Sequence, residues 1–332
     1  MADEARTDNV RPQPRRLAVI VPVRNEGQNI PLFYERARPV LDGLPGLAAW
    51  TLVFVNNASE DESLDVIKQL RARDPHVQVM TLSRNFGYHQ AMVAGLSHID
   101  SDVYGIIDVD CEDPPEMLRE LYAGIQAGYA VVYGIRSRRQ ELKVITFGRK
   151  VFYGTLRRLA DADFVEWMSE FALITRQVRN AILVPRTTYP FLRAEMGYVG
   201  FRRLGIRYVR AKRQHGASHF NFLGMIRFAV GGLLASSTFP LRLVLYLAAV
   251  IGPGFVLMVW WRHPSLVEAG ALAALTSLGF LLIALPLSTL YLARTYKNVM
   301  ARPVFVIDDT RTFLDAPAGA GVANPALLEG VL

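Results

Sequence analysis

Cysteine is almost absent from this sequence. Its 332 residues include a single one, Cys111, so neither an internal disulfide nor a four-cysteine zinc site can form. Such sparing use of cysteine is compatible with a reducing cytoplasm. An apolar leader is lacking too, because residues 1–16 are polar and rich in Arg and Pro. We therefore expect no secretory signal, and a catalytic part that stays on the side where it is made.

Motifs of several enzyme classes are also missing. The spacing of residues indicates no zinc motif, nucleophile elbow or P-loop. Of the scattered histidines, His76, His98 and His263 are interpreted as structural, whereas His89 and His219 are candidate site residues. The formal net charge is +7, but the basic residues lack the interleaved aromatics of a nucleic-acid surface. A membrane surface and phosphate ligands explain this charge better, and we predict no nucleic-acid partner.

Apolar residues are abundant, at 51% of the chain, and the excess lies after residue 239. The runs 240–261 and 269–293 are each long enough to cross a hydrocarbon core about 30 Å thick. We predict a transmembrane hairpin with both ends in the cytoplasm, because basic residues gather outside the runs. A buried helix pair of a soluble protein is the alternative. The flanking basic residues are Arg227, Arg242, Arg294, Lys297 and Arg302.

The remaining segments suggest how the chain is divided. In 220–238 apolar residues recur at helical spacing, which predicts an amphipathic helix lying on the membrane. A packed domain helix is the alternative there. The expected parts are a flexible tail at 1–16, an α/β domain at 17–215, a juxtamembrane helix at 216–239, two spans within 240–293 and a cytoplasmic tail at 294–332.

Short β-branched runs alternate with helical patterns over the first half of the chain. This alternation is typical of βαβ units, and it predicts an α/β fold with a mostly parallel sheet and helices on both faces. Ligands of such sheets bind at the carboxyl ends of the strands. The predicted strands are 17–23, 52–56, 77–82, 103–109 and 130–135, and the predicted helices are 28–42, 60–73, 88–99 and 115–127.

Acidic residues end the strand predicted at 103–109. Asp108 and Asp110 lie one residue apart there, and Glu112 follows two positions later. Mg²⁺ or Mn²⁺ is typically held by one or two carboxylates together with substrate phosphates. We predict a metal site at these three residues, with solvated turn residues as the alternative. Asp113 precedes two prolines and is interpreted as a helix N-cap.

The strand predicted at 52–56 ends in a polar loop. Ser59 and Glu62 have the spacing of a capping box, which accounts for part of this loop without any function. Asn56 and Asn57 remain at the strand end, where a carboxamide can read the edge of a base because it both donates and accepts.

Two further groups of residues have candidate ligand roles. Asn25 and Glu26 follow the strand at 17–23 and are available for nucleotide contacts, or they form a helix-entry turn. Arginine suits phosphate because its planar donors can grip two oxygens. The basic residues after the strand at 130–135 are Arg136, Arg138, Arg139, Arg149, Lys150, Arg157 and Arg158.

Eight segments together follow the pattern of one family. They are PVRNE at 22–26, VNNASEDES at 55–63, SRNFG at 83–87, DVDCEDPPE at 108–116, VVYGIR at 131–136, GASHFNF at 216–222, PLRL at 240–243 and YKNVMARPVFVI at 296–307. The chain resembles the polyprenyl-phosphate glycosyltransferases related to dolichyl-phosphate mannose synthase, which are inverting family 2 enzymes of the GT-A fold. The paired apolar runs narrow the resemblance to the bacterial branch that acts on undecaprenyl phosphate or a similar lipid.

The resemblance implies roles for individual residues and a place in the cell. It implies a bacterial inner-membrane enzyme that takes a nucleotide sugar and a polyprenyl phosphate, uses Mg²⁺ or Mn²⁺, and forms a homo-oligomer such as a tetramer. The expected catalytic residues are Asp110, Glu170 and Arg136. The expected donor-binding residues are Pro22, Val23, Asn25, Glu26, Asn57 and Asp108. Arg136, Arg138 and Arg149 are expected at the acceptor phosphate, and Asp108, Asp110 and Glu112 at the metal.

The sequence also departs from the family pattern. The family usually has two aspartates where Asn56 and Asn57 stand, which leaves the base, uridine or guanosine, open. It usually has Tyr at Arg24, Gln at Glu112 and Lys at His219. Where relatives show Gly-Asp-Phe-Arg this chain has Ser-Glu-Phe-Ala at 169–172, so Glu170 takes the place of a catalytic-side aspartate.

A mechanism follows as a hypothesis. An oxygen of the lipid phosphate attacks the anomeric carbon opposite the departing nucleotide diphosphate and inverts that centre. A phosphate monoester is largely dianionic near neutrality, so no strong base is needed. A non-catalytic nucleotide-sugar-binding membrane scaffold, and a transferase that extends a polysaccharide, are the alternatives.

Overall fold

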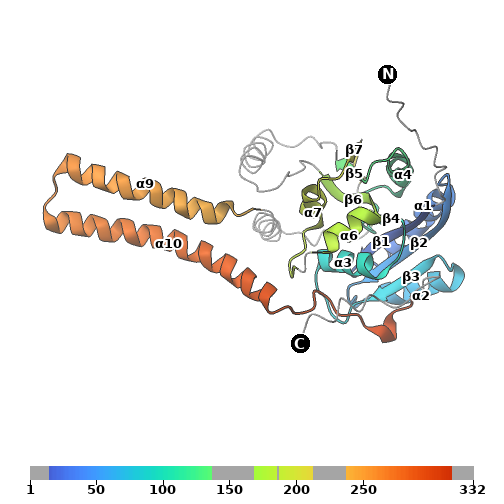
Figure 1. Ribbon diagram of the computed structural model, residues 1–332. Helices are drawn as coiled ribbons and strands as arrows, with labels where there is room; N and C mark the ends of the chain where they lie inside the picture. The colour runs from blue at the N-terminus through green and yellow to red at the C-terminus, as the bar shows by residue number, and fades with distance from the viewer. Residues whose placement is uncertain (1–14, 137–167, 185–186, 212–236, 316–332) are drawn as a thin grey trace, which may run out of the picture.

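A single seven-stranded sheet forms the centre of the part that this computed structural model describes, residues 15–136, 168–184, 187–211 and 237–315. Its strand order is β3-β2-β1-β4-β6-β5-β7 (Figure 1). β6 runs antiparallel to both of its neighbours, and the other pairs are parallel. The strands are β1 (Arg15–Val23), β2 (Leu47–Asn56), β3 (Val77–Thr81), β4 (Val103–Ile106), β5 (Val131–Arg136), β6 (Met168–Thr175) and β7 (Arg203–Tyr208).

The central strands are apolar on both sides, as a sheet covered on both faces requires. Along β1, Leu17, Val19 and Val21 belong to one hydrophobic core. Ala18 and Ile20, which alternate with them, belong to the core on the opposite face. All five side chains are at most 1% exposed, so the sheet separates two buried layers.

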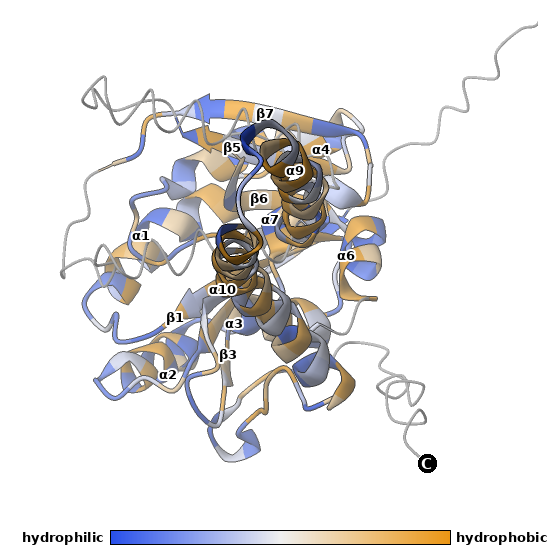
Figure 2. Cartoon of the chain, turned by 90° about the vertical axis from the view of Figure 1, so that its left-hand side faces the viewer, coloured by the Kyte–Doolittle hydropathy of each residue, from blue (hydrophilic) through white to orange (hydrophobic). Residues whose placement is uncertain are grey.

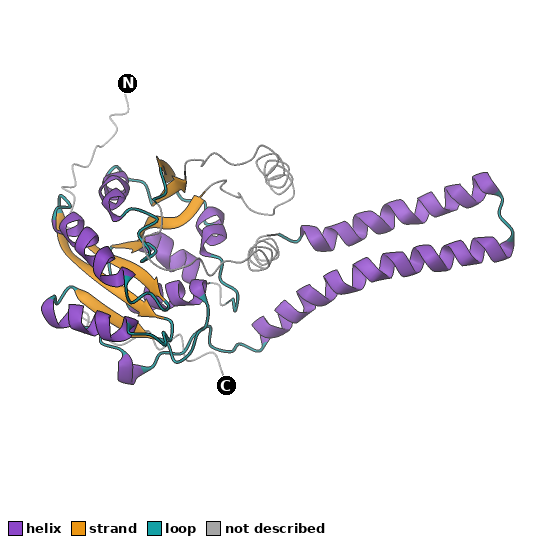
Figure 3. Cartoon of the chain, turned by 180° about the vertical axis from the view of Figure 1, so that it is seen from behind, coloured by secondary structure: helices purple, strands orange, loops and turns teal. Residues whose placement is uncertain are grey.

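Helices cover each of these layers (Figure 3). The core that contains Leu17 is closed by α1 (Asn29–Asp42), α2 (Ser63–Arg73) and α4 (Leu118–Gln126), which follows the short helix η1 (Pro115–Met117). The opposite core is closed by α3 (Tyr88–His98), α6 (Arg176–Leu183) and α7 (Leu192–Tyr198). The predicted α/β fold with helices on both faces is therefore confirmed.

Two of the strands were not expected from the sequence. β6 and β7 both lie beyond the five predicted strands, and β6 inserts between β4 and β5. Because β6 is antiparallel, its first residues lie at the edge where the parallel strands end. This insertion brings Glu170 to the ligand edge of the sheet. β4 ends at Ile106, earlier than the predicted residue 109, so Asp108 and Asp110 lie in the loop that follows.

The hairpin consists of α9 (Phe239–Arg262) and α10 (Leu266–Val299), which project together from the α/β part. Both are long and apolar enough to cross a membrane, and their most apolar windows are only 0% and 6% buried. This exposure argues against a helix pair buried in a soluble core. Figure 2 shows the apolar colouring along both helices. Apolar surface exposed on this scale is typical of a site of membrane association.

The residues after α10 return to the sheet. The chain forms isolated antiparallel bridges with β3 and the residue after it, pairing Phe313 with Val79 and Ile307 with Leu82. At the end of α10, Asn298 Oδ1 accepts hydrogen bonds from the backbone N–H and the hydroxyl of Thr188, at 3.1 and 2.6 Å. The hairpin is thus joined to the α/β part after its second helix. The juxtamembrane helix predicted at 220–238 and the tail at 1–16 lie almost wholly outside the described residues.

Candidate functional site

Charged side chains gather where β1, β2, β4, β5 and β7 end and β6 begins. We call five of them the acid cluster. They come from the loop after β4 and from the start of β6, segments that are distant in sequence but adjacent in the sheet. The acid cluster consists of Asp108, Asp110, Glu112, Asp113 and Glu170.

Asp108 is the member of the acid cluster whose pKa is raised. Its Oδ1 accepts a hydrogen bond of 2.5 Å from the hydroxyl of Tyr88, at the start of α3. Burial, and after it the neighbouring carboxylates of Asp113 and Asp110, raise the pKa of Asp108 to about 7, against the hydrogen bond from Tyr88, which lowers it. Ionisation of Asp108 is therefore opposed by its burial and by the acids beside it.

The other two predicted metal ligands point in different directions. Asp110 Oδ1 accepts the backbone N–H of Glu112 at 3.0 Å. Glu112 Oε2 forms an ion pair of 2.5 Å with Arg210, which follows β7. Among the described residues no three His, Cys, Asp or Glu side chains form a group ready to hold a metal ion. Asp108 and Asp110 thus lie together, whereas Glu112 is engaged with an arginine.

Asp113 does not cap a helix, so its interpretation as an N-cap was wrong. The helix η1 begins after Pro114 without any side-chain cap. Asp113 is instead 1% exposed, pairs with Arg136 at 2.9 Å and accepts a hydrogen bond from the hydroxyl of Tyr208. A buried carboxylate needs a charged partner more than an exposed helix end needs a cap. Arg136, predicted to bind phosphate, is held by this pair.

Glu170 is buried on β6 at the same edge. It forms an ion pair with Arg193 of α7 and is 7% exposed. Burial opposes its ionisation, but the charge and hydrogen bond of Arg193, together with His89 and Arg136, outweigh this effect and hold the pKa of Glu170 below its ordinary value. Beside the pair, the His89 ring packs edge-on against Phe191 at 5.3 Å between centroids. Glu170 is therefore ionised at pH 7. Burial lowers the pKa of His89, and its imidazole is therefore neutral at the same pH.

The loops after β1 and β2 bind each other. The capping box predicted at Ser59 and Glu62 is absent, because α2 begins later, at Ser63, with no side-chain cap. Ser59 Oγ instead accepts the backbone N–H of Asn25 at 3.0 Å, and Ser63 Oγ accepts that of Glu26 at 2.9 Å. These hydroxyls serve the neighbouring loop rather than their own helix.

The predicted donor-binding residues differ in what they offer a ligand. Pro22 and Val23 are buried at the end of β1. Asn25 Oδ1 accepts the backbone N–H of Glu60 at 2.8 Å, and Glu26 Oε2 accepts from the amide of Asn29 at 2.5 Å. The structure brings these residues to the ligand edge, but it engages their side chains in holding the loops.

Arg24 and Asn57 strengthen the same junction. Arg24 donates to the carbonyl oxygens of Asn57 and Ala58 at 3.0 and 2.6 Å, and it pairs with Glu60 at 2.9 Å. The Asn57 amide turns the other way, toward the loop that precedes α3. Arg138 and Arg149, predicted at the acceptor phosphate, lie outside the described residues.

Several residues of this edge were missed in the sequence. Tyr88 directly follows the SRNFG segment, which was a usable signal for its place near the site. Arg193 lies on α7, Tyr208 ends β7 and Arg210 follows it; neither element was predicted, and no spacing links these residues to the acidic loop. They become neighbours of the acid cluster through the strand order alone.

Comparison with known proteins assigns this arrangement to a family. The model of the family "Glycosyl transferase family 2" matches residues 18–184, about half of the chain. A bactoprenol glucosyl transferase of Shigella flexneri, derived from the SfII prophage, is 31% identical over 308 residues, which are 88% of this chain and 97% of the relative. A prophage bactoprenol glucosyl transferase homologue of Escherichia coli is 30% identical, with 88% of this chain and 98% of the relative covered.

A likeness in structure is more distant. Glucosyl-3-phosphoglycerate synthase from Mycobacterium tuberculosis, solved with uridine diphosphate, has a TM-score of 0.47 and 18% sequence identity over 67% of this chain and 79% of that one. At this level the likeness identifies no ligand of the present protein. The family match and the relatives that span most of the chain decide the assignment: the chain belongs to glycosyl transferase family 2 and is a glycosyltransferase.

Proposed function

We propose that this chain moves one sugar from a UDP- or GDP-linked donor to a polyprenyl phosphate of undecaprenyl type, with inversion at the anomeric carbon. The observation that carries the proposal is the likeness to bactoprenol glucosyl transferases over 88% of the chain. The apolar hairpin supports a lipid acceptor, because a transferase with a soluble acceptor needs no such surface.

The acid cluster suits a hard divalent cation. Carboxylate oxygens are the ligands such cations take, and one or two of them suffice when substrate phosphates supply the rest. Within the described part of the chain, Asp113, Glu170 and Glu112 of the acid cluster pair with arginines, whereas burial and the neighbouring acids raise the pKa of Asp108 to about 7. We place Mg²⁺ or Mn²⁺ at Asp108 and Asp110, with Glu112 as a third ligand once it leaves Arg210. When bound, the cation neutralises charge on the leaving diphosphate.

The chain's own residues then bind and orient the reactants. Glu170 is ionised, so it accepts hydrogen bonds from hydroxyl groups of the sugar or orients the acceptor rather than donating a proton. The phosphate nucleophile is already anionic and needs no base. Pro22, Val23, Asn25, Glu26 and Asn57 line or support the nucleotide site, by the resemblance and by their place at the strand ends.

The acceptor phosphate lies on the side of β5. Arg136 is anchored there by Asp113 and Tyr208, and we assign it, with Arg138 and Arg149, to the lipid phosphate. A guanidinium can grip two phosphate oxygens and offsets the repulsion between the acceptor and the donor diphosphate. The basic flanks of the hairpin favour an inner-membrane protein with the catalytic domain and both termini in the cytoplasm. We also expect a homo-oligomer.

The proposal is tested with the full-length protein purified in detergent. It is incubated with undecaprenyl phosphate, Mn²⁺ or Mg²⁺, and radiolabelled UDP- and GDP-sugars tested one at a time, and the organic phase is then separated by thin-layer chromatography. We expect one donor to give a lipid-linked monosaccharide that depends on the cation and the lipid. Asp110→Ala serves as the inactive control.

Two outcomes would contradict the proposal. A polymer that grows with time would indicate an enzyme that extends polysaccharide. Donor binding without any transfer, with every donor and lipid tested, would indicate a non-catalytic binder. Full activity of the Asp110→Ala variant would reject the metal assignment while leaving the transfer reaction in place.

A further inference from the structure

We propose that Asn57 is a positioning residue that holds the turn at residues 85–87 and thereby places the Tyr88 hydroxyl on Asp108. This inference rests on the proposed function, because it assigns Asp108 to the cation. It differs from the expectation that Asn57 reads the nucleotide base. The hydrogen bonds of the Asn57 amide distinguish the positioning role from the base-reading role.

Both donors of the Asn57 amide, and one acceptor position of its oxygen, are directed at one turn. Its Nδ2 donates to Asn85 Oδ1 at 3.0 Å and to the carbonyl oxygen of Gly87 at 3.1 Å. Its Oδ1 accepts the backbone N–H of Phe86 at 2.9 Å. The orientation of the amide is fixed, because a backbone N–H can only donate and a carbonyl oxygen can only accept. Asn57 is 4% exposed and both of its donors are engaged within the protein, so its amide has no donor to offer a base.

The turn itself is built to end where α3 begins. Asn85 Oδ1 also accepts the backbone N–H of Gly87, at 3.0 Å. Gly87 has φ +117° and ψ 166°, a conformation that is essentially restricted to glycine. A Cβ at this position would also lie 2.5 Å from Oε1 of Gln90. The path of the chain into α3 is therefore determined by Gly87 and by the hydrogen bonds that Asn57 makes.

Tyr88 directly follows the turn, and its side chain connects the turn to the acid cluster. Its hydroxyl donates to Asp108 Oδ1 at 2.5 Å, which fixes one oxygen of that carboxylate. Groups that hydrogen-bond a metal ligand orient it, and their loss typically lowers metal affinity about 10- to 100-fold. The structure thus links β2, through Asn57 and the turn, to the carboxylate at the end of β4.

This reading also accounts for an asparagine where relatives of the family pattern have aspartate. A carboxylate at position 57 would still accept from Phe86, but it would face Asn85 Oδ1 and the Gly87 carbonyl with no proton to share. Two donated hydrogen bonds would become two repulsive contacts. Asn57 is therefore matched to the Asn85–Gly87 turn of this chain, and restoring the family's acid here is expected to harm the site.

The experiment measures binding of Mn²⁺ to the full-length protein by electron paramagnetic resonance, with and without inorganic pyrophosphate. No nucleotide base is present, so a base-reading role cannot contribute. Tyr88→Phe is expected to raise the dissociation constant about 10-fold, and Asn57→Ala and Asn85→Ala several-fold. In the Tyr88→Phe background Asn57→Ala should add less than about twofold, because both act through the same contact. Asn180→Ala, an exposed asparagine on α6, is the matched control and should bind as the wild type does.

Hydrogen exchange gives a second readout that does not involve the cation. The Phe86 amide should lose protection in Asn57→Ala, and the Gly87 amide in Asn85→Ala. Asn85 is exposed, so Asn85→Ala keeps the test available if Asn57→Ala does not fold.

Unchanged Mn²⁺ affinity in Tyr88→Phe, or a full additive loss in the double variant, would overturn the inference. So would an Asn57→Ala variant that keeps its Mn²⁺ affinity but changes its relative inhibition by UDP and GDP. A wild-type protein that binds no Mn²⁺ would instead reject the metal site of the proposed function, and this inference with it. The two failures are thus distinguishable.

Discussion

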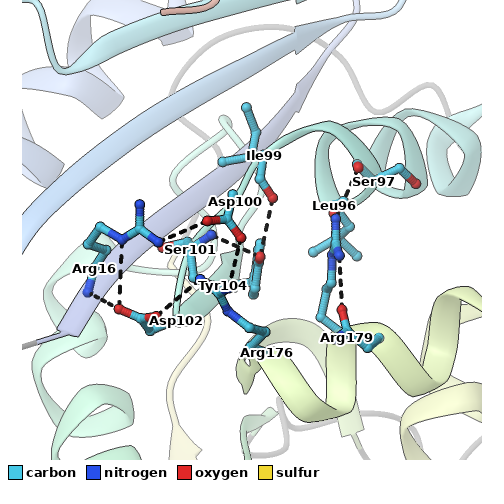
Figure 4. Close-up of polar contacts among 11 residues, drawn as sticks. Arg16, Leu96, Ser97, Ile99, Asp100, Ser101, Asp102, Tyr104, Arg176 and Arg179 are labelled. Atoms are coloured by element: carbon cyan, nitrogen blue, oxygen red, sulfur yellow. Dashed lines mark hydrogen bonds and ion pairs between the residues drawn. The ribbon is translucent and has the colours of Figure 1, made fainter. Parts of the chain in front are cut away.

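Acidic residues at the two ends of the sheet differ in how their charge is paired within the protein. At the amino ends of the strands, Asp100 and Asp102 are each paired with Arg16 and Arg176 (Figure 4). At the carboxyl ends, the acid cluster outnumbers the arginines that contact it among the described residues. Acids at the first end are balanced within the protein. At the second end, burial and neighbouring acids raise the pKa of Asp108 to about 7.

Buried carboxylates make the same contrast clearer. Asp74, which precedes β3, is 1% exposed and accepts from the Tyr34 hydroxyl at 2.6 Å and the His76 backbone N–H at 2.9 Å. Burial opposes its ionisation, but these hydrogen bonds outweigh it, and the pKa of Asp74 lies below its ordinary value. Burial and neighbouring acids instead raise the pKa of Asp108 to about 7. A carboxylate destabilised in the folded protein is a candidate for function, whereas one that is satisfied is a structural part.

The strongest test of the comparison is Asp110→Asn. It keeps the shape of the side chain and removes one charge from the edge where charge is in excess. We expect transfer to fall at least about 100-fold, because stabilisation of developing charge is a large catalytic term. Transfer rate is measured with the lipid assay described above. Thermal unfolding in detergent should be unchanged or slightly higher, since repulsion at the edge is relieved; a large loss of stability would mean that Asp110 is structural.

Asp113→Asn tests the most deeply buried of the arginine-paired members of the acid cluster. Asp113 is buried between Arg136 and Tyr208, so removing its charge leaves a guanidinium without its counterion. We expect a loss of about 3 kcal/mol in the free energy of unfolding. Denaturant unfolding measures this loss. A loss well below 1 kcal/mol would show that Arg136 finds another partner and that the pair does not hold the edge.

The pH dependence of stability tests the satisfied carboxylate at the opposite end. The lowered pKa of Asp74 means that its contribution is fully present above its unfolded pKa of about 3.9 and is lost as pH falls through the folded value. Asp74→Asn should cost about 1–3 kcal/mol at pH 7 and should lack this acid-side loss. Free energies of unfolding measured from pH 7 down to pH 2 check both points. Equal acid-side slopes in the variant and the wild type would contradict the assignment.

Much of the fold was predictable because its signals are local. Strand β1 is a continuous apolar run, the hairpin consists of two long uncharged runs, and each can be read without its neighbours. The strand at 168–175 has no such signal, since Ser169 and Glu170 interrupt its apolar residues. Its insertion between β4 and β5 depends on tertiary pairing, which no sequence spacing records.

The site, like the fold, was predictable only where the signal is local in the sequence. Asp108 and Asp110 were placed at a strand end by the apolar run before them, and the structure has them there. Asp113 was misread because Pro114 and Pro115 give a strong local pattern for a helix start, whereas its partners Arg136 and Tyr208 are far away in the sequence. Local chemistry thus identifies which residues can act, and the strand order decides which of them meet.

The smallest expected effect belongs to Asp102→Asn, the counterpart of Asp110→Asn before the other end of β4. Asp102 Oδ2 accepts the backbone N–H of Arg16 at 2.8 Å, and Oδ1 pairs with Arg176 at 3.1 Å. Its side chain is 38% exposed, so water screens the pair and its loss should cost less than about 1 kcal/mol of unfolding free energy. The transfer rate should stay within about twofold of the wild type, because Asp102 lies at the end of the sheet opposite the acid cluster. A large loss of transfer with normal stability would mean that charge at the amino ends also serves the reaction, and that balance within the protein does not separate structural acids from functional ones.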